Sequence, residues 1–154
     1  MIERADILLV EDNPADIELA RHAFSRCRVA CRFDVVKDGE EALDFLFCRG
    51  VYAKRERVEP PRCVLLDLKL PKVDGLEVLR QLKEAPLLRR VPVIVLSSSS
   101  QASDIARSYD LGANSYLVKP LEFGEFTQLA SDISRYWLEL NQDAQQGMLS
   151  PSVA

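Results

Sequence analysis

Four apolar runs of the sequence end in side chains that can take part in chemistry. In chain order these side chains are Glu11 with Asp12, then Asp67, Ser97 and Lys119. A carboxylate such as Asp67 is costly to bury at the end of an apolar strand unless a cation or polar group meets it. Three neighbouring carboxylates can hold Mg²⁺, and a carboxylate beside Mg²⁺ can attack phosphorus to give an acyl phosphate. A lysine and a hydroxyl can then stabilise the phosphoryl charge.

The elements that position these residues are short strands. Five runs rich in Val, Ile or Leu predict strands, and four of them are nearly continuous, which is typical of strands covered on both faces of a parallel sheet. The run at 33–36 is more mixed, as an edge strand can be. The predicted strands cover residues 5–10, 33–36, 63–68, 91–97 and 115–118.

Helical spacing of apolar residues separates the predicted strands. Asn13 is placed as an N-cap, with Pro14 and Asp16 in the first turn. Ile17, Ala20, Phe24 and Cys27 then share one face, and further helices are predicted at 40–48, 75–85, 102–110 and 121–140. Strand–helix alternation predicts an α/β fold, a doubly wound parallel sheet with helices on both faces. Ligands bind such a sheet beyond the carboxyl ends of its strands, so the chemical side chains should converge there.

Composition restricts the class of protein. The chain has 154 residues, 47% of them hydrophobic and 29% charged, with a net charge of −4. No basic surface for nucleic acid is predicted, and no run approaches the ~20 apolar residues that span a membrane. With no signal peptide pattern, we expect a cytoplasmic protein. The four cysteines, Cys27, Cys31, Cys48 and Cys63, are too scattered for a zinc site and are expected to be reduced thiols.

The domain organisation is predicted to be simple. One domain should cover residues 1–140, and the polar segment 141–154 should be a frayed or disordered tail, too short for an output domain. Residues 49–62 are charged, contain two prolines and are expected to form a long exposed loop. Each chemical residue alone also has an ordinary structural explanation, such as a helix cap or a turn. Their joint placement at one sheet edge favours a functional site.

Four segments of the chain resemble the motifs of response regulator receiver domains, the phosphoryl-accepting partners of two-component systems. The segments are LLVEDNP, CVLLDLKLPKVDG, VIVLSSS and NSYLVKP, and the resemblance extends over roughly residues 5–138. Thirty residues separate Asp67 from Ser97, and twenty-two separate Ser97 from Lys119, which agrees with the family. The resemblance implies a flavodoxin-like (βα)5 fold with strand order 2-1-3-4-5.

The resemblance also implies a role for each residue of the site. Asp67 would be the phosphoacceptor, Tyr116 an aromatic switch, and Lys119–Pro120 a cis peptide bond. Mg²⁺ would be held by Glu11, Asp12, Asp67 and the backbone carbonyl of Lys69. The phosphoryl group would be contacted by Ser97, Ser98 and Lys119. Ser98 departs from the alanine or glycine that is commonest in the family, and Lys69 stands at a position that tunes phosphate lifetime.

The implied function is that of a stand-alone response regulator, not an enzyme beyond self-catalysed phosphoryl transfer and slow autodephosphorylation. The expected donor is a sensor histidine kinase, and a histidine phosphotransfer protein is a further possible partner. The long loop and SRYWLEL resemble small regulators paired with bacteriophytochrome kinases. A homodimer through the fourth helix, fifth strand and fifth helix would use Tyr136, Trp137 and Leu140, although Trp137 could equally close the core.

Two other functions compete with this interpretation. One is a protein-binding module with a receiver fold that acts independently of phosphorylation. The intact acids, Ser97 and Lys119 disfavour it, because a scaffold has no physical need for them. The other is a phosphatase with an aspartyl-phosphate nucleophile. Such enzymes place a second acid two residues after the nucleophile, and that position is occupied here by Lys69.

Overall fold

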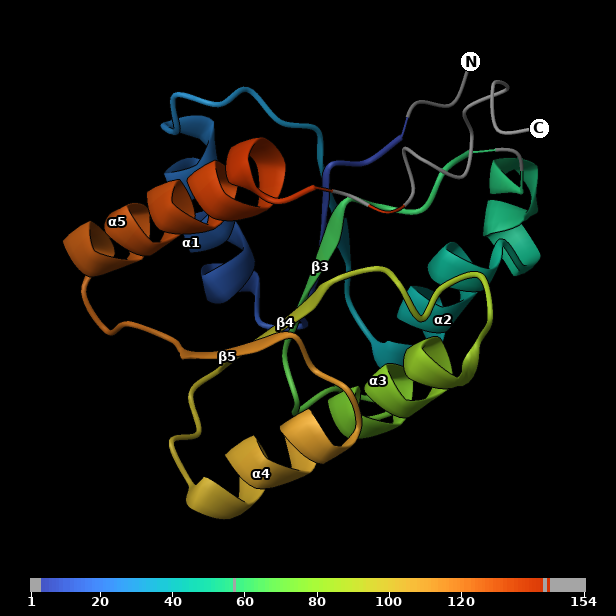
Figure 1. Cartoon of the computed structure of the whole chain (residues 1–154). Coiled ribbons are helices and arrows are strands. Elements are labelled where there is room, and N and C mark those ends of the chain that lie inside the picture. The colour runs from blue at the N-terminus through green and yellow to red at the C-terminus, as the bar shows by residue number, and fades with distance from the viewer. Residues whose placement is uncertain (1–3, 57, 143, 145–154) are drawn as a thin grey trace.

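A five-stranded parallel sheet forms the centre of the computed structural model, which describes residues 4–56, 58–142 and 144 (Figure 1). Its strand order, β2-β1-β3-β4-β5, confirms the predicted fold. The strands are β1 (Ile7–Val10), β2 (Phe33–Val36), β3 (Cys63–Leu66), β4 (Val93–Ser97) and β5 (Ser115–Val118). The mixed pattern of β2 is explained by its edge position. The second edge strand, β5, is also only partly covered, although its continuous apolar run had predicted burial on both faces.

Helices cover both faces of the sheet (Figure 1). They are α1 (Pro14–Ser25), α2 (Gly39–Phe47), α3 (Gly75–Glu84), α4 (Ala102–Asp110) and α5 (Phe123–Ser134). One core joins the sheet to α1 and α5 through residues such as Ile17 and Phe126. The other joins it to α2 and α3 through Leu46 and Leu79, with α4 packed beside α3 and β5. No helix in the described part of the chain is both long enough and apolar enough to span a bilayer.

Side-chain caps fix where the first helices begin. The Asn13 side chain accepts hydrogen bonds from the backbone N–H groups of Ala15 and Asp16, which confirms the predicted N-cap of α1. Asp38 and Asp74 cap α2 and α3 in the same way. Such caps satisfy amide groups that have no partner within the helix. Each helix therefore starts at a defined point just beyond the carboxyl end of a strand.

Two glycines begin helices where the backbone is in close contact with another segment. A Cβ atom at Gly75, the first residue of α3, would lie 2.2 Å from the carbonyl oxygen of Asp67. A Cβ atom at Gly39, the first residue of α2, would lie 1.8 Å from the carbonyl oxygen of Val73. Real Cβ atoms do not approach backbone so closely. The loop between Asp67 and Gly75 is consequently held between the starts of two helices.

Residues 49–62 differ from the expected exposed loop. They contain a 3₁₀ helix, η1 (Gly50–Arg55), which packs on α2. The Tyr52 ring lies 5.1 Å from the Phe45 ring, and the Tyr52 hydroxyl donates a 2.8 Å hydrogen bond to Glu41. Arg55 is buried. The prediction was wrong because these contacts are tertiary and leave no periodic pattern in the charged sequence.

The end of the chain also differs from expectation. The helix predicted at 121–140 starts at Phe123 and changes at Ser134 into a π-helix, η2 (Arg135–Leu140). The Lys119–Pro120 peptide bond is trans, so the expected cis bond is not found. The trans form is favoured by ~0.5–1 kcal/mol even before proline. Most of the predicted tail, residues 143 and 145–154, lies outside the described residues.

Candidate functional site

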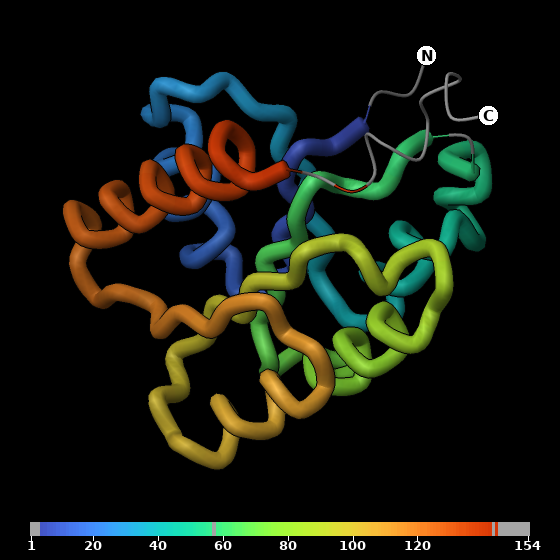
Figure 2. The backbone as a smooth tube through the Cα atoms, viewed as in Figure 1, coloured from blue at the N-terminus to red at the C-terminus, as the bar shows by residue number. Residues whose placement is uncertain are grey.

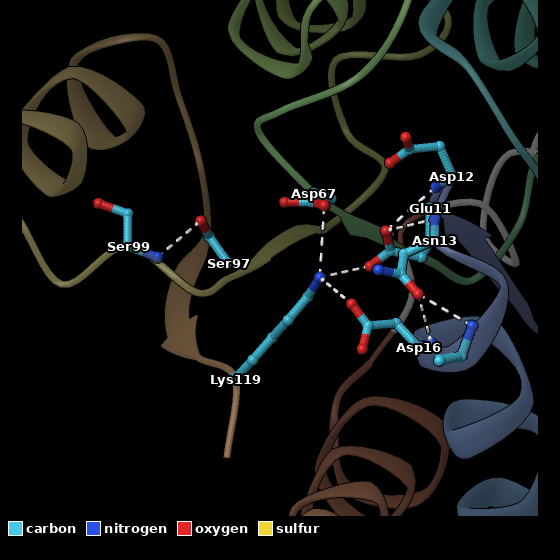
Figure 3. Close-up of polar contacts among 9 residues, drawn as sticks. Glu11, Asp12, Asn13, Asp16, Asp67, Ser97, Ser99 and Lys119 are labelled. Atoms are coloured by element: carbon cyan, nitrogen blue, oxygen red, sulfur yellow. Dashed lines mark hydrogen bonds and ion pairs between the residues drawn. The ribbon is translucent and has the colours of Figure 1, made fainter. Parts of the chain in front are cut away.

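The carboxyl ends of β1, β3, β4 and β5 bring together the predicted residues (Figure 3). Glu11 and Asp67 are buried, with exposed fractions of 2% and 9%, whereas Asp12 is exposed. Carboxylate oxygens of these three residues all lie within 4.8 Å of one another. The convergence that was predicted from the strand ends is therefore present in the structure.

Lys119 is the cation that meets these acids. Its side chain is only 13% exposed, and Nζ donates to Asp16 Oδ2 at 3.1 Å, to Asp67 Oδ2 at 3.3 Å and to Glu11 Oε1 (Figure 3). Burial alone would lower the pKa of Lys119, but the bonds to the three carboxylates outweigh it and raise the pKa. Lys119 is consequently a fully charged ammonium at neutral pH. The Lys119 ammonium also explains why the Asp67 carboxylate can be buried, because a charged partner lies beside this carboxylate.

Glu11 is held from both sides of its carboxylate. Its Oε2 accepts hydrogen bonds from the backbone N–H groups of Asp12 at 3.1 Å and Asn13 at 3.2 Å, while Oε1 accepts from Lys119. Burial raises the pKa of Glu11, the ion pair with Lys119 opposes this, and the charge of Asp67 adds to the increase, so that the pKa is above its usual range. Proton binding at Glu11 will therefore compete with metal binding at a higher pH than usual.

Ser97 lies at the end of β4 and is 2% exposed. Its Oγ accepts a 3.1 Å hydrogen bond from the backbone N–H of Ser99. The Ser99 hydroxyl donates to Asp104 Oδ2 at 2.5 Å, and the Ser99 carbonyl accepts a 2.8 Å hydrogen bond from the Tyr116 hydroxyl. Tyr116 is thereby tied to the β4–α4 loop. A change at Ser97 can reach Tyr116 through the single residue Ser99.

A cavity of about 390 Å³ opens beside the acids. Asp12, Lys69, Ser97 and Ser99 are among its lining residues. Lys69 is exposed and lines this cavity. The role of its backbone carbonyl as a metal ligand stays a prediction. Ser98 is exposed and does not line the cavity, so its contact with a phosphoryl group stays a prediction.

The donor set suits a hard divalent cation. Glu11, Asp12 and Asp67 offer carboxylate oxygens, which are the ligands that Mg²⁺ and Mn²⁺ prefer, and the exposed cavity leaves space for metal-bound water. Counting Asp16, the cluster holds four carboxylates, and Lys119 is the one cation that the described residues pair with them. A divalent cation would relieve most of this excess negative charge.

Sequence reasoning missed the site contact of Asp16. Asp16 was placed correctly in the first turn of α1, but its ion pair with Lys119 was not predicted. The available signal is its position in the first turn of α1, three residues after the N-cap Asn13, because this turn begins beside the carboxyl end of β1. The hydrogen bonds of Ser99 with Asp104 and Tyr116 were likewise not predicted.

The fold and this site together define a flavodoxin-like α/β domain with a carboxylate–lysine centre at the carboxyl edge of its sheet. The family model for the response regulator receiver domain matches residues 7–131. The chain belongs to this family, and it is therefore a receiver-domain response regulator of the two-component type.

Three relatives illustrate the similarity. The probable methanogenesis regulatory protein FilR2 of Methanothrix harundinacea is 44% identical over 136 residues, which cover 88% of this chain and 85% of FilR2. Response regulator Rcp1 of Synechocystis sp. is 38% identical, covering 86% of this chain and 88% of Rcp1. The Mn²⁺-bound structure of Rcp1 superposes with a TM-score of 0.80. The phosphorylated cyanobacterial phytochrome response regulator RcpA is 41% identical with a TM-score of 0.83, covering 90% of this chain and 97% of RcpA.

Proposed function

We propose that Asp67 accepts a phosphoryl group from a sensor histidine kinase in a Mg²⁺-dependent reaction. The observation that carries the proposal is the position of the buried Asp67 side chain. Its carboxylate lies within 4.8 Å of the carboxylates of Glu11 and Asp12, which could hold a metal ion, and its Oδ2 lies 3.3 Å from Lys119 Nζ. A carboxylate oxygen of Asp67 forms the new P–O bond while the P–N bond of the kinase phosphohistidine breaks, and the released imidazole takes up a proton.

Each neighbour has a role in this proposal. Glu11, Asp12, Asp67 and the Lys69 carbonyl would hold Mg²⁺, which when bound neutralises charge that builds up on the transferred group. Lys119 already donates to Asp67 and can move its hydrogen bond to a phosphoryl oxygen. The Ser97 hydroxyl now accepts a hydrogen bond from the backbone N–H of Ser99, and it can instead donate a hydrogen bond to an oxygen of the phosphoryl group. These residues lower the barrier by electrostatic stabilisation.

The proposed output is a change of partner. Moving Ser97 towards a phosphoryl group would disturb Ser99 and free the Tyr116 hydroxyl, so that the surface of α4, β5 and α5 changes. Side chains near this surface are already apolar and exposed, as in Tyr109, Val118 and Leu121. We propose a homodimer on this face, with Tyr136 and Leu140, 50% and 58% exposed, as contacts. Trp137 is half-buried against the core and serves packing as well.

A phytochrome-type histidine kinase is the proposed donor, supported by similarity to RcpA. FilR2, which is 44% identical, is named as a probable methanogenesis regulatory protein, so histidine kinases of other types must be compared in the same assay. A histidine phosphotransfer protein is a further proposed partner.

The test is intact mass after incubation with Mg²⁺ and a small phosphodonor, for the wild type, Asp67→Asn and Ser98→Ala. The proposal expects one added phosphoryl group in the wild type and in Ser98→Ala, and none in Asp67→Asn or with EDTA. Size-exclusion chromatography of the phosphorylated and unphosphorylated wild type then tests whether the chain forms the proposed homodimer. If neither the small donor nor a panel of histidine kinases modifies the wild type, the alternative of a phosphorylation-independent binding module is favoured.

A further inference from the structure

A second, larger cavity lies away from the phosphoacceptor site. It has a volume of about 710 Å³ and is lined by the end of α2, by the α3–β4 loop and by residues 55, 56 and 58–61 at and after the end of η1. Figure 2 shows the backbone of these segments on the right side of the molecule. Part of its wall is the segment just before β3, whereas Asp67 follows the other end of that strand. Ligand cavities in proteins typically measure about 300–1,000 Å³. Its size is therefore that of a small-molecule site.

The cavity wall is mostly apolar. Phe47, Val58, Pro61 and Leu88 contribute to it. Two acids also line it, but Glu59 forms a 2.8 Å ion pair with Arg4 and Glu56 is exposed to solvent. An apolar compartment of this kind accommodates a hydrocarbon group, which gains free energy by leaving water.

One charged side chain of this wall, Arg55, is buried without a counterion among the described residues. Arg55 is 6% exposed, and no hydrogen bond or ion pair joins its guanidinium to any described residue. Its Nε is fully shielded and unpaired, while the terminal nitrogens are not among the fully shielded unpaired atoms and so border accessible space. The guanidinium lies 3.7 Å from the centroid of the Phe45 ring. The Tyr52 hydroxyl, also on η1, donates its proton to Glu41.

A buried cation without a partner is energetically unfavourable. Burial lowers the pKa of Arg55, although electrostatic interactions with Cys48, Asp34 and Tyr52 partly oppose the shift. The ring of Phe45 compensates a part of the lost hydration through a cation–π contact, but it provides no hydrogen-bond acceptor. The missing component at this place is an anion with acceptor oxygens.

We propose that this cavity binds a small amphipathic carboxylate, with its hydrocarbon part against the apolar wall and its carboxylate paired with Arg55. A single guanidinium, with Glu56 and Glu59 nearby, matches one negative charge better than the two charges of a phosphate ester. A carboxylate can also accept two parallel hydrogen bonds from a guanidinium. The site is independent of the proposed phosphorylation of Asp67.

The test compares decanoate with decanol, which share a similar chain but differ in charge. Titrations of the full chain, followed by calorimetry and by the NMR signal of the Arg55 Nε–H group, should show one decanoate site in the wild type. Decanoate should bind at least about tenfold more tightly than decanol. The preference should fall below about twofold in Arg55→Met, which keeps the apolar length of the side chain.

Matched variants make the result specific. Lys54→Met removes a positive charge from the exposed neighbour on η1 and should retain the preference. Asp67→Asn should also retain it, which separates this site from phosphoryl transfer. Equal binding of decanoate and decanol, an unchanged preference in Arg55→Met, or no binding at all would overturn the proposal. An Arg55-dependent dimer that does not bind decanoate would also overturn it and assign the cavity to a second copy of the chain.

Discussion

Lys119 and Arg55 are two buried cations in very different surroundings. Lys119 has a 13% exposed side chain and contacts Asp16, Asp67 and Glu11, all carboxylates. Arg55 is 6% exposed, and its guanidinium lies 3.7 Å from the centroid of the Phe45 ring. The first cation offsets part of an excess of negative charge at the sheet edge, whereas the second has no counterion in the part of the chain that the structure describes.

The difference shows that burial of charge has opposite meanings in the two regions. At the sheet edge, the carboxylates would repel one another without Lys119, so the lysine stabilises the fold while the site stays poised for a metal. Beside η1, the buried Arg55 guanidinium lowers the stability of the folded state, because no described residue compensates its lost hydration with a hydrogen bond. Replacing each cation by an apolar side chain of similar length should therefore change stability in opposite directions.

The largest expected effect is that of Lys119→Met. The variant leaves the buried carboxylates of Glu11 and Asp67 without their cation, and breaking a buried pair in this way costs about 3–5 kcal/mol. We expect urea unfolding in EDTA to show a loss of about 3 kcal/mol, and Mg²⁺ should restore part of it because the metal supplies positive charge. Lys72→Met, at a side chain that is 61% exposed, is the control and should change stability by less than about 0.5 kcal/mol.

Arg55→Met should have the opposite sign. Removal of an unpaired buried charge, with an apolar chain kept in its place, is expected to raise the free energy of unfolding by about 1–2 kcal/mol. The matched control is Arg80→Met, because Arg80 is 43% exposed and pairs with Glu77 and Glu84 on α3. That control should be neutral or slightly destabilising. A clear loss of stability in Arg55→Met would mean that the contact with Phe45 compensates the charge.

Metal affinity should depend on pH through Glu11. The raised pKa of Glu11 means that a proton competes with the metal above the usual carboxylate range, and protonation removes a ligand charge. Mg²⁺ binding should therefore weaken as pH falls, by up to about tenfold per pH unit, or ~1.4 kcal/mol, below that pKa. Calorimetric titrations between about pH 5 and pH 8 measure the slope, and Glu11→Gln should flatten it. An equally steep slope in Glu11→Gln would assign the proton to another group.

The smallest expected effect is that of Asp16→Asn. Asp16 is 37% exposed, and Lys119 keeps Glu11 and Asp67 as partners when it is removed. Stability in EDTA should fall by about 0.5 kcal/mol. Glu18→Gln removes a charge from the same helix at an 80% exposed position and should have no measurable effect. A loss above about 2 kcal/mol in Asp16→Asn would mean that Asp16 is the principal partner of the lysine.

The backbone arrangement of the site was predictable because parallel strands deliver their carboxyl ends to one edge. Once the runs ending at Glu11, Asp67, Ser97 and Lys119 were placed in one sheet, their convergence followed. The apolar pattern predicted which face of α1 packs on the sheet, but it did not predict how close the first turn of α1 lies to the end of β5, and this distance decides that Asp16 reaches Lys119. Contacts between elements of this kind depend on packing, which a single sequence does not specify.

The exact ends of the strands were likewise not predictable from the sequence. Val91 and Pro92 are buried and had been included in a strand, but β4 begins only at Val93. Apolar runs report burial, and burial extends beyond the hydrogen-bonded ladder. In η1 the sequence is charged and predicts an exposed loop, but the segment packs on α2 through Tyr52, and Arg55 is buried. The position of the unpaired guanidinium was therefore not predictable from the sequence.

The close backbone approaches at Gly39 and Gly75 have a genetic consequence. Every non-synonymous single-nucleotide change in a glycine codon yields a residue with a Cβ atom or a stop codon, and neither position has room for that atom. At Gly124, by contrast, an added Cβ would meet nothing within 4 Å. A saturation library selected for folded protein should thus retain glycine alone at positions 39 and 75 while position 124 diversifies, so that the two helix starts beside the loop after Asp67 should tolerate no substitution.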